Sequence, residues 1–360
     1  MAKYEELFVK KSVWGAIISM AVPSVITVMV MILYNMADMF FIGQMGDARQ
    51  VAAISIAGPV FSIAGALVTM IGSGGSAMIA KSLGEGEKNM ARIYASLCFW
   101  GALLMGIIIG IMIILFREPL LGILGATSDT RAFARTYMII CAAGVPFMLV
   151  STTLASIIRS EGVILEGVIG NMTATVINII LDPIFILVFK MGVAGAALAT
   201  VLGNLTGCIY FFIYVKRKAQ ILNMNPTLAL QKPTALFHII TLGMPNALGN
   251  LLSGVASTFS NQLLVLYGTN AVAAMAAAGK TTMIIAMIQM GICMGVQPLL
   301  AYNYGAKNTK RLKETVKALV ILTCGVGLVC GIGCYLARHA IIAMFLKDAA
   351  AVQMGESMVI

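Results

Sequence analysis

Two aspartates, Asp38 and Asp182, lie inside long apolar stretches of the sequence. A charged side chain at the centre of a membrane costs about 2.5–3.5 kcal/mol on insertion scales, so an acid in such a place indicates a function. Burial and a second negative charge nearby both favour the protonated, neutral form of a carboxyl group. The chemistry that such a pair could perform is the uptake and release of a proton, or the binding of a small cation such as Na⁺.

Polar residues at helical spacing accompany the second aspartate. One segment carries four of them, spaced by four, three and four positions: Asn171, Thr175, Asn178 and Asp182. They share one helix face, which cannot point wholly toward lipid without a penalty and must line a cavity or a partner helix. At a rise of about 1.5 Å per residue, Asp38 reaches a depth comparable to that of Asp182, and Thr200 returns to that level on the following segment.

We therefore predict an ion-coupling site formed by Asp38, Asn178, Asp182 and Thr200. The alternative interpretation is a buried structural network, or an Asp38 close enough to the surface to be hydrated. No catalytic residue is predicted, and no metal site other than a possible Na⁺ site at the two aspartates. Asp38 has no acidic counterpart further along the chain, as the internal repeat described below shows.

The elements that must position these residues are membrane helices. Hydrophobic residues make up 60% of the chain and charged residues 11%, a composition that no soluble domain of this size could carry on its surface. A spanning helix needs roughly 20 mostly apolar residues, and about nine such stretches recur. They are Val13–Ile42, Val51–Ser82, Ile93–Phe116, Arg131–Ile158, Glu166–Phe189, Val193–Val215, Ala235–Tyr267, Asn270–Tyr302 and Leu312–Ala337. We expect an all-α polytopic membrane protein.

Basic residues alternate between the gaps that separate these spans. Of the 24 Lys and Arg residues, 16 lie in the N-terminal segment and every second gap, whereas 7 lie in the other gaps. Positive residues stay on the cytoplasmic side during insertion, so the pattern predicts a multi-pass protein of the cell inner (plasma) membrane with a cytoplasmic N-terminus. The net charge of +10 is thus a topology signal rather than a sign of nucleic-acid binding.

The second half of the chain repeats the first at an offset of about 221 residues. Lys-Ser-Leu-Gly at 81–84 matches Tyr-Asn-Tyr-Gly at 302–305, and Ala-Val-Pro at 21–23 matches Gly-Met-Pro at 243–245. Each unit contains six spans and enters the membrane in the same direction, which predicts two parallel six-helix repeats. The repeat partner of Asp38 is Ser260, which cannot carry a proton as a carboxylate does, so coupling is expected in the first lobe only.

The repeat also predicts the domain organisation. Residues 1–218 form an N-terminal lobe of six helices, 219–234 a cytoplasmic linker, and 235–360 a partial C-terminal lobe with helices seven to nine and the start of ten. In this register the last residues fall within the tenth helix. The second lobe is therefore expected to be incomplete.

Four segments resemble the multidrug and toxic compound extrusion (MATE) family of secondary transporters. They are Asn35-Met-Ala-Asp38-Met-Phe-Phe-Ile-Gly43, Ile-Arg159-Ser-Glu-Gly162, Asn178-Ile-Ile-Leu-Asp182-Pro183 and Gly295-Val-Gln-Pro-Leu-Leu-Ala-Tyr-Asn-Tyr-Gly305. The resemblance implies a two-lobe MATE-type fold around a central cavity, with Asp38, Asn178, Asp182 and Thr200 matching the ion site of the first lobe. The acid that some members carry in the seventh span is absent.

The function that this resemblance implies is secondary active efflux of multiple drugs or organic cations, by H⁺- or Na⁺-coupled antiport with alternating access. We expect twelve further side chains to line the substrate cavity: Tyr34, Asn35, Asn171, Thr175, Asn204, Asn246, Asn250, Ser257, Asn261, Met287, Met290 and Gln297. The expected partners are small cationic or amphiphilic substrates and membrane lipid, with no nucleic acid. A monomer without a cofactor, apart from the coupling ion, is expected.

Two other functions are open at this stage. A flippase for lipid-linked saccharides would share the two-lobe plan, but it should carry several basic residues facing the cavity, and only Lys280 lies deep in a span. An integral membrane enzyme would need a constellation of His, Ser and acidic residues. The two histidines of this chain lie near span ends without such partners, so we predict that it is not an enzyme.

Overall fold

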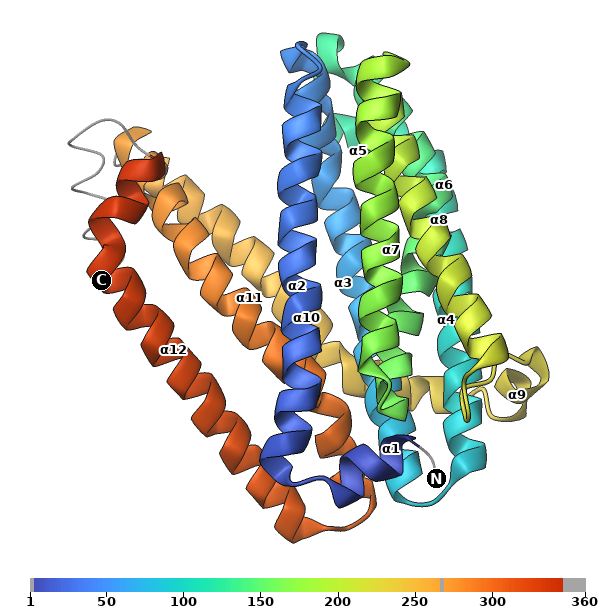
Figure 1. Ribbon diagram of the computed structural model, residues 1–360. Helices are drawn as coiled ribbons and strands as arrows, with labels where there is room; N and C mark the ends of the chain where they lie inside the picture. The colour runs from blue at the N-terminus through green and yellow to red at the C-terminus, as the bar shows by residue number, and fades with distance from the viewer. Residues whose placement is uncertain (1–2, 266–268, 346–360) are drawn as a thin grey trace.

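The protein is a bundle of long helices (Figure 1). The computed structural model describes residues 3–265 and 269–345, and within them it leaves some side chains undescribed. Nine helices in these ranges are long and apolar enough to cross a membrane, and the same ranges contain no strand. The predicted all-α membrane fold is confirmed.

The long helices follow the predicted spans to within a few residues at most ends. They are α2 (Val13–Gly43), α3 (Ala48–Gly84), α4 (Lys88–Leu115), α6 (Ser128–Ile158), α7 (Ile164–Pro183), α8 (Val193–Arg217), α10 (Ala235–Val265), α11 (Thr269–Gly305) and α12 (Thr309–Phe345). Short elements lie between them: α1 (Lys3–Glu5), η1 (Glu6–Lys10), α5 (Arg117–Ile123), η2 (Arg159–Glu161), η3 (Ile184–Val188) and α9 (Pro226–Gln231). Sequence periodicity did not reveal these because each is too short to show a pattern.

Helices α2 to α8 form the first lobe, and α6 is its central element. It packs against α3, α4 and α8, and 61% of its most apolar window is buried inside the protein. Helices α10, α11 and α12 belong to the second lobe. They meet the first lobe at the end that carries the N-terminus and diverge from it toward the opposite end (Figure 1). We call these the N-terminal end and the far end.

Glycines allow the two lobes to touch closely at the N-terminal end. A Cβ atom on Gly84 of α3 would overlap with the carbonyl group of Tyr302, and one on Gly305 of α11 would overlap with the carbonyl group of Lys81. The contact is reciprocal because these two glycines are repeat partners. Only glycine permits such an approach between two backbones, so this point is a tight junction between the lobes.

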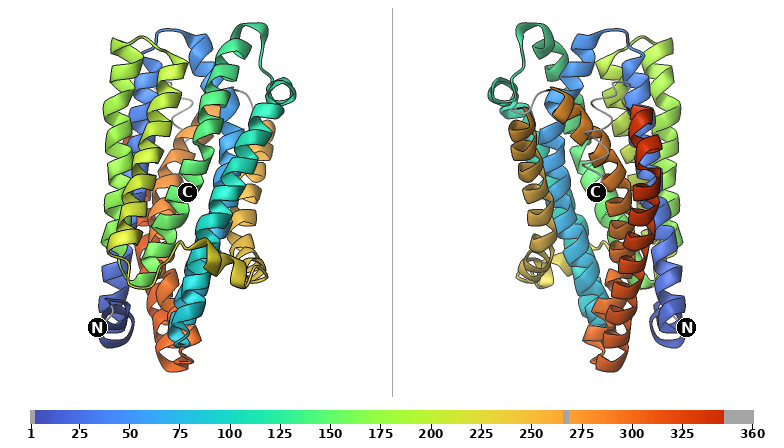
Figure 2. Two further views of the ribbon diagram at one scale, coloured as in Figure 1. Left: turned by 90° about the vertical axis from the view of Figure 1, so that its right-hand side faces the viewer. Right: turned by 90° about the vertical axis from the view of Figure 1, so that its left-hand side faces the viewer.

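The first residues of the chain bridge the same junction. Phe8 is fully buried, and its ring centroid lies 5.2 Å from that of Tyr302 on α11. The Arg311 Nη2 donates a hydrogen bond of 2.6 Å to the carbonyl oxygen of Lys11. On the other side, the backbone of Tyr4 lies against Gly162 of the first lobe. The N-terminal segment thus contacts both lobes at once, at the end of the bundle where Figure 2 marks the N-terminus.

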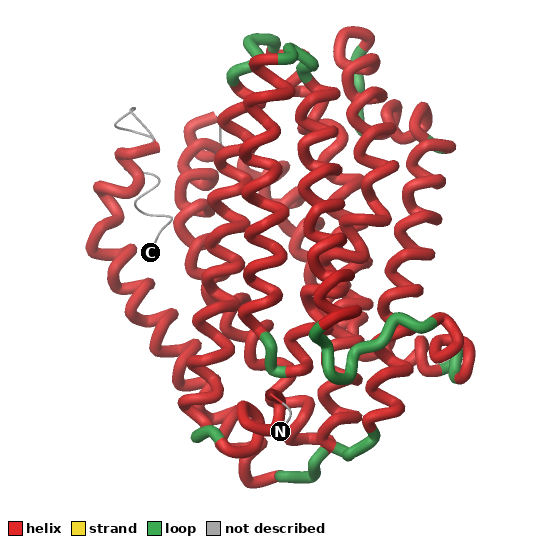
Figure 3. Tube along the Cα trace, turned by 45° about the vertical axis from the view of Figure 1, so that its right-hand side comes forward, coloured by secondary structure: helices red, strands yellow, loops and turns green. Residues whose placement is uncertain are grey.

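Most connections lie at the two ends of the bundle, but the connection between α8 and α10 does not. It leaves α8 and runs along the side of the bundle to α9, where Figure 3 shows it as a loop projecting from the helices. Helix α9 packs against α4. The predicted linker therefore includes a segment that lies on the outer surface of the first lobe.

Candidate functional site

The site predicted around Asp182 lies where α7 loses its regular geometry. Asp182 is 0% exposed, and Asn178, one turn earlier on the same face, is 2% exposed. Pro183 follows directly and cannot donate a backbone hydrogen bond. The next residues form the π-helical turn η3 (Ile184–Val188), a distortion that is frequent at functional sites. The Asp-Pro sequence therefore ends the helix at the acid.

Helix α8 supplies the hydroxyl that the sequence predicted beside this acid. The Asn178 Nδ2 lies 3.5 Å from the Thr200 Oγ1, at the limit of a hydrogen bond in which the amide donates. The Thr200 hydroxyl donates to the carbonyl oxygen of Ala196 at 3.0 Å, and the Asn204 side chain donates to the carbonyl oxygen of Thr200, also at 3.0 Å. These polar side chains therefore share the interface between α7 and α8.

Helix α2 brings Asp38 to the same place. It packs against α7, and the Asp38 carboxylate is close enough to Asp182 for the two to interact electrostatically. The Tyr34 hydroxyl, one turn before Asp38, lies next to Thr200 and within the electrostatic range of both acids. The structure thus brings together all four residues of the predicted ion-coupling site, although their role stays a prediction.

The oxygen atoms of this cluster lack donors. Asp38 Oδ1, both Oδ atoms of Asp182 and Asn178 Oδ1 are buried and accept no hydrogen bond from any described residue. Among the lysine and arginine side chains that the structure describes, none forms an ion pair with either aspartate. Carboxylate oxygens that are buried without a donor or a counter-charge are costly unless they bind a proton or a cation. Carboxylate and amide oxygens are also the ligands that hard cations prefer.

Helix α6 contributes two residues that the sequence did not single out. Tyr137 lies within the electrostatic range of Asp38 and Tyr34, and its hydroxyl is hydrogen-bonded to the Cys141 side chain. No sequence pattern distinguished them, since a tyrosine near a span end is typical of the membrane interface and a cysteine in a span behaves as a small apolar residue. Only the packing of α6 against the cluster identifies them.

The predicted cavity residues fall into three groups. Asn171 and Thr175 are half-buried on the face of α7 that carries Asp182. In the second lobe, Asn246 and Asn250 are exposed on α10, Met290 is exposed on α11 and Met287 is half-buried. The side chains of Asn35, Ser257 and Asn261 lie outside the described part of the protein, as does that of Lys280.

Two of the second-lobe residues contact α3 rather than the carboxylate cluster. The Asn250 amide donates to the Thr69 hydroxyl at 3.4 Å, and the Gln297 amide donates to the carbonyl oxygen of Ser73 at 3.3 Å. Gln297 lies near the last turns of α11, at the N-terminal end, whereas Asp182 lies near the far end. These side chains therefore belong to the contact between the lobes.

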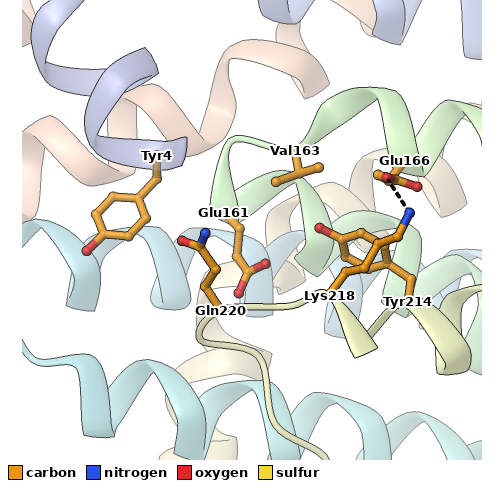
Figure 4. A pocket seen from close by; sticks show the side chains of 7 residues that line it. All are labelled: Tyr4, Glu161, Val163, Glu166, Tyr214, Lys218 and Gln220. Atoms are coloured by element: carbon orange, nitrogen blue, oxygen red, sulfur yellow. Dashed lines mark ion pairs between the residues drawn. The ribbon is translucent and has the colours of Figure 1, made fainter. Parts of the chain in front are cut away.

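A separate pocket at the N-terminal end holds another buried acid, Glu161 (Figure 4). Glu161 is 3% exposed, and its Oε1 accepts hydrogen bonds from the backbone N–H groups of Ile221 and Leu222 at 2.7 and 2.8 Å. Beside it, the Lys218 Nζ lies 3.6 Å from Glu166. The pocket encloses only about 50 Å³, too little for a drug-sized molecule. Its acid instead fixes the start of the linker.

The sequence model of the MatE family matches residues 23–184 and 245–360 of this chain. The multidrug export protein MepA of Staphylococcus saprophyticus is 31% identical over 351 residues, which cover 98% of this chain and 78% of that protein. MepA of Staphylococcus aureus strain N315 is 30% identical over 97% of this chain and 77% of its own length.

Solved structures show the same fold. A crystal structure of a MATE protein in complex with MaL6 has a TM-score of 0.92 at 24% identity, and the match covers 100% of this chain and 80% of that one. An outward-facing conformation of a multidrug resistance MATE family transporter has a TM-score of 0.89 at 24% identity, over 98% of this chain and 78% of that one. The resemblance of the motifs is confirmed, and the chain belongs to the MatE family.

Proposed function

We propose that this protein exports small cationic or amphiphilic molecules, including drugs, by antiport with H⁺ or Na⁺. The observation that carries the proposal is the cluster of buried, donor-free oxygen atoms on Asp38, Asp182 and Asn178. The relatives at about 30% identity are described as multidrug export proteins, which supports the substrate class. No cofactor other than the coupling ion enters the proposal, and a monomer suffices for it.

The cluster couples two ligands through its charge. An uncompensated carboxylate pair in a low-dielectric environment attracts a proton, a Na⁺ ion or a cationic substrate, and each of these neutralises the same charge. Binding of one therefore weakens binding of the others. Antiport requires such mutual exclusion, because the transporter must change its conformation with either the ion or the drug bound, and not with both.

The lobes provide the alternating access. The basic residues predict that the N-terminal end is cytoplasmic, so the arrangement in Figure 1, closed at that end and diverging at the far end, corresponds to the outward-facing state. In this orientation Asp38 and Asp182 lie near the outer surface, where an external ion reaches them first. Ion binding then favours the state that opens toward the cell, by its differential affinity for the two states.

Gradient-driven efflux tests the proposal. The full-length protein is reconstituted in liposomes, a pH or Na⁺ gradient is imposed separately, and efflux of a fluorescent organic cation is followed. We expect one of the two gradients to drive efflux in the wild type, and Asp182→Asn to lose that response. Asp129→Asn is a matched control because Asp129 is an exposed carboxylate outside the cluster.

The outcome that contradicts the proposal is equally direct. If Asp38→Asn and Asp182→Asn both keep full gradient-driven efflux, the cluster does not couple transport to an ion. If neither gradient drives efflux in the wild type, while the protein still binds the cation, secondary antiport itself is wrong.

A further inference from the structure

A second, much larger cavity lies on the outside of the first lobe at the N-terminal end. It has a volume of about 730 Å³ and is bounded by α4, α8 and the segment that leads from α8 to α9. In Figure 3 this segment is the loop that projects beside the helices. The cavity is remote from the carboxylate cluster, which lies near the far end. Its walls must therefore serve another purpose.

The wall formed by the loop is held in place by specific hydrogen bonds. The Trp100 Nε1 on α4 donates to the carbonyl oxygen of Met224 at 3.0 Å, and the Ser96 hydroxyl donates to the carbonyl oxygen of Asn225 at 2.7 Å. Glu161 holds the beginning of the same loop from the other side. Because three side chains of the first lobe fix this loop, the cavity is a built feature and not a gap beside a free linker.

The mouth of the cavity is positively charged. Arg92 on α4 and Lys216 on α8 line it and are both exposed, and no acidic residue lines it among the described residues. Neither cation forms an ion pair within the part of the chain that the structure describes. Two unpaired cations from different helices at one opening attract an anionic group, and phosphate suits the planar fork of arginine.

The inner wall of the cavity is apolar and extends away from the charges. Leu103 lies eleven residues beyond Arg92 on α4, which corresponds to about 16 Å along the helix. Phe212, one turn before Lys216, is 41% exposed, and its ring centroid lies 6.4 Å from that of Phe99. Both α4 and α8 are among the candidate membrane spans. The groove therefore runs from a charged opening into the hydrocarbon region, as a phospholipid does.

We propose that this cavity binds an anionic phospholipid. Its phosphodiester group lies between Arg92 and Lys216, and an acyl chain follows the wall formed by Phe99, Leu103 and Phe212. The lipid comes from the leaflet at the N-terminal end, which the proposed orientation makes the cytoplasmic one. The site does not depend on the proposed antiport. A soluble phosphate compound would leave the apolar wall uncovered, and that difference separates the two ligands experimentally.

Binding of single lipids to the purified full-length protein tests the site. Native mass spectrometry in detergent measures retention of phosphatidylglycerol and, in parallel, of phosphatidylcholine with the same acyl chains. A surface cation contributes about fivefold to binding of an anionic lipid, so Arg92→Gln or Lys216→Gln should weaken phosphatidylglycerol binding about fivefold, and the double variant about 30-fold. Lys310→Gln/Lys313→Gln removes the same charge from exposed positions of the second lobe, and should leave binding within about twofold of the wild type.

Three results would overturn the proposal. The first is equal retention of phosphatidylcholine and phosphatidylglycerol, because charge would not be recognised. The second is a loss of binding in the control double variant as large as in Arg92→Gln/Lys216→Gln, because attraction would then be a property of the whole surface. The third is displacement of phosphatidylglycerol by soluble glycerol phosphate, because the apolar wall would then contribute nothing. The efflux assay in liposomes of phosphatidylcholine alone tests antiport and does not test the lipid site. The lipid-binding proposal and the antiport proposal can therefore fail independently of each other.

Discussion

The two lobes share a helical plan but differ in what their helices bury. In the first lobe, α7 buries Asn178 and Asp182 completely, and α6 is the most buried span of the protein. In the second lobe, the repeat partner of Asp38 is Ser260, which is exposed on α10, and the most apolar window of α12 is 0% buried within the described ranges. Among the side chains that the structure describes, the buried acids thus lie in the first lobe. This asymmetry is consistent with the proposal that the first lobe binds the coupling ion and the second lobe moves against it.

The largest expected effect comes from making the first lobe resemble the second. Asp38→Ser places in α2 the residue that its repeat partner carries, and it removes a carboxylate that can hold a proton or a cation. Gradient-driven efflux in liposomes should fall to the level measured without a gradient. The counterpart Ser260→Ala should keep the wild-type rate, and a loss in Ser260→Ala equal to that in Asp38→Ser would show that both lobes take part in coupling.

The reciprocal glycine contact tests the one place where the lobes are expected to behave alike. Ala at Gly84 or Gly305 must displace a carbonyl group of the facing helix, and such overpacking costs about 1–3 kcal/mol. This cost shifts the equilibrium away from the state closed at the N-terminal end by about 5- to 150-fold. Distances between spin labels at the N-terminal ends of α4 and α12 should lengthen in both variants. Gly58→Ala is the control, since a Cβ there meets nothing within 4 Å. If only one of the two variants opens this end, the contact is not a symmetric junction.

The smallest effect concerns the far end of the first lobe. Burial alone would raise the pKa of Glu118, but hydrogen bonds and charges from Arg131 and Arg135 together lower it below its ordinary value of 4.5. A lowered pKa in the folded protein means that the contribution to stability is present above pH 4.5 and is lost as the pH falls through the folded value. The thermal unfolding temperature of the wild type should therefore approach that of Glu118→Gln as the pH falls below 4.5 and through the lowered pKa of the folded protein. A constant difference between them at all pH values would contradict this assignment.

Much of the fold could be predicted because a helix that spans a membrane requires a long apolar stretch, which is easily recognised in the sequence. The nine spanning helices of the described residues follow from the length of apolar stretches, and the two-lobe plan follows from the repeat. The short helix α9 and the π-helical turn after Pro183 could not be predicted, since the first is too short for periodicity and the second depends on how α7 ends. The course of the linker along α4 depends on the hydrogen bonds of Trp100 and Glu161, which connect residues far apart in the sequence.

The candidate site also has a part that could be predicted from the sequence and a part that could not. Spacing along α7 and counting from helix ends were enough to place Asp38, Asp182, Asn178 and Thr200 at one level. Nothing in those patterns specifies which face of α6 meets them, so Tyr137 and Cys141 were missed. For α10 and α11, a polar or Met-rich stripe does not distinguish a cavity wall from a helix contact. Gln297, whose amide donates to α3, illustrates that ambiguity.

The packing of Phe8 on Tyr302 has a consequence for how the protein is made. Phe8 leaves the ribosome well before Tyr302, the residue against which its ring packs. Until α11 is translated and inserted, the Phe8 side chain cannot be buried against Tyr302. The contact between Phe8 and Tyr302 can therefore form only after α11 has been made, so it is a late step in the assembly of the two lobes.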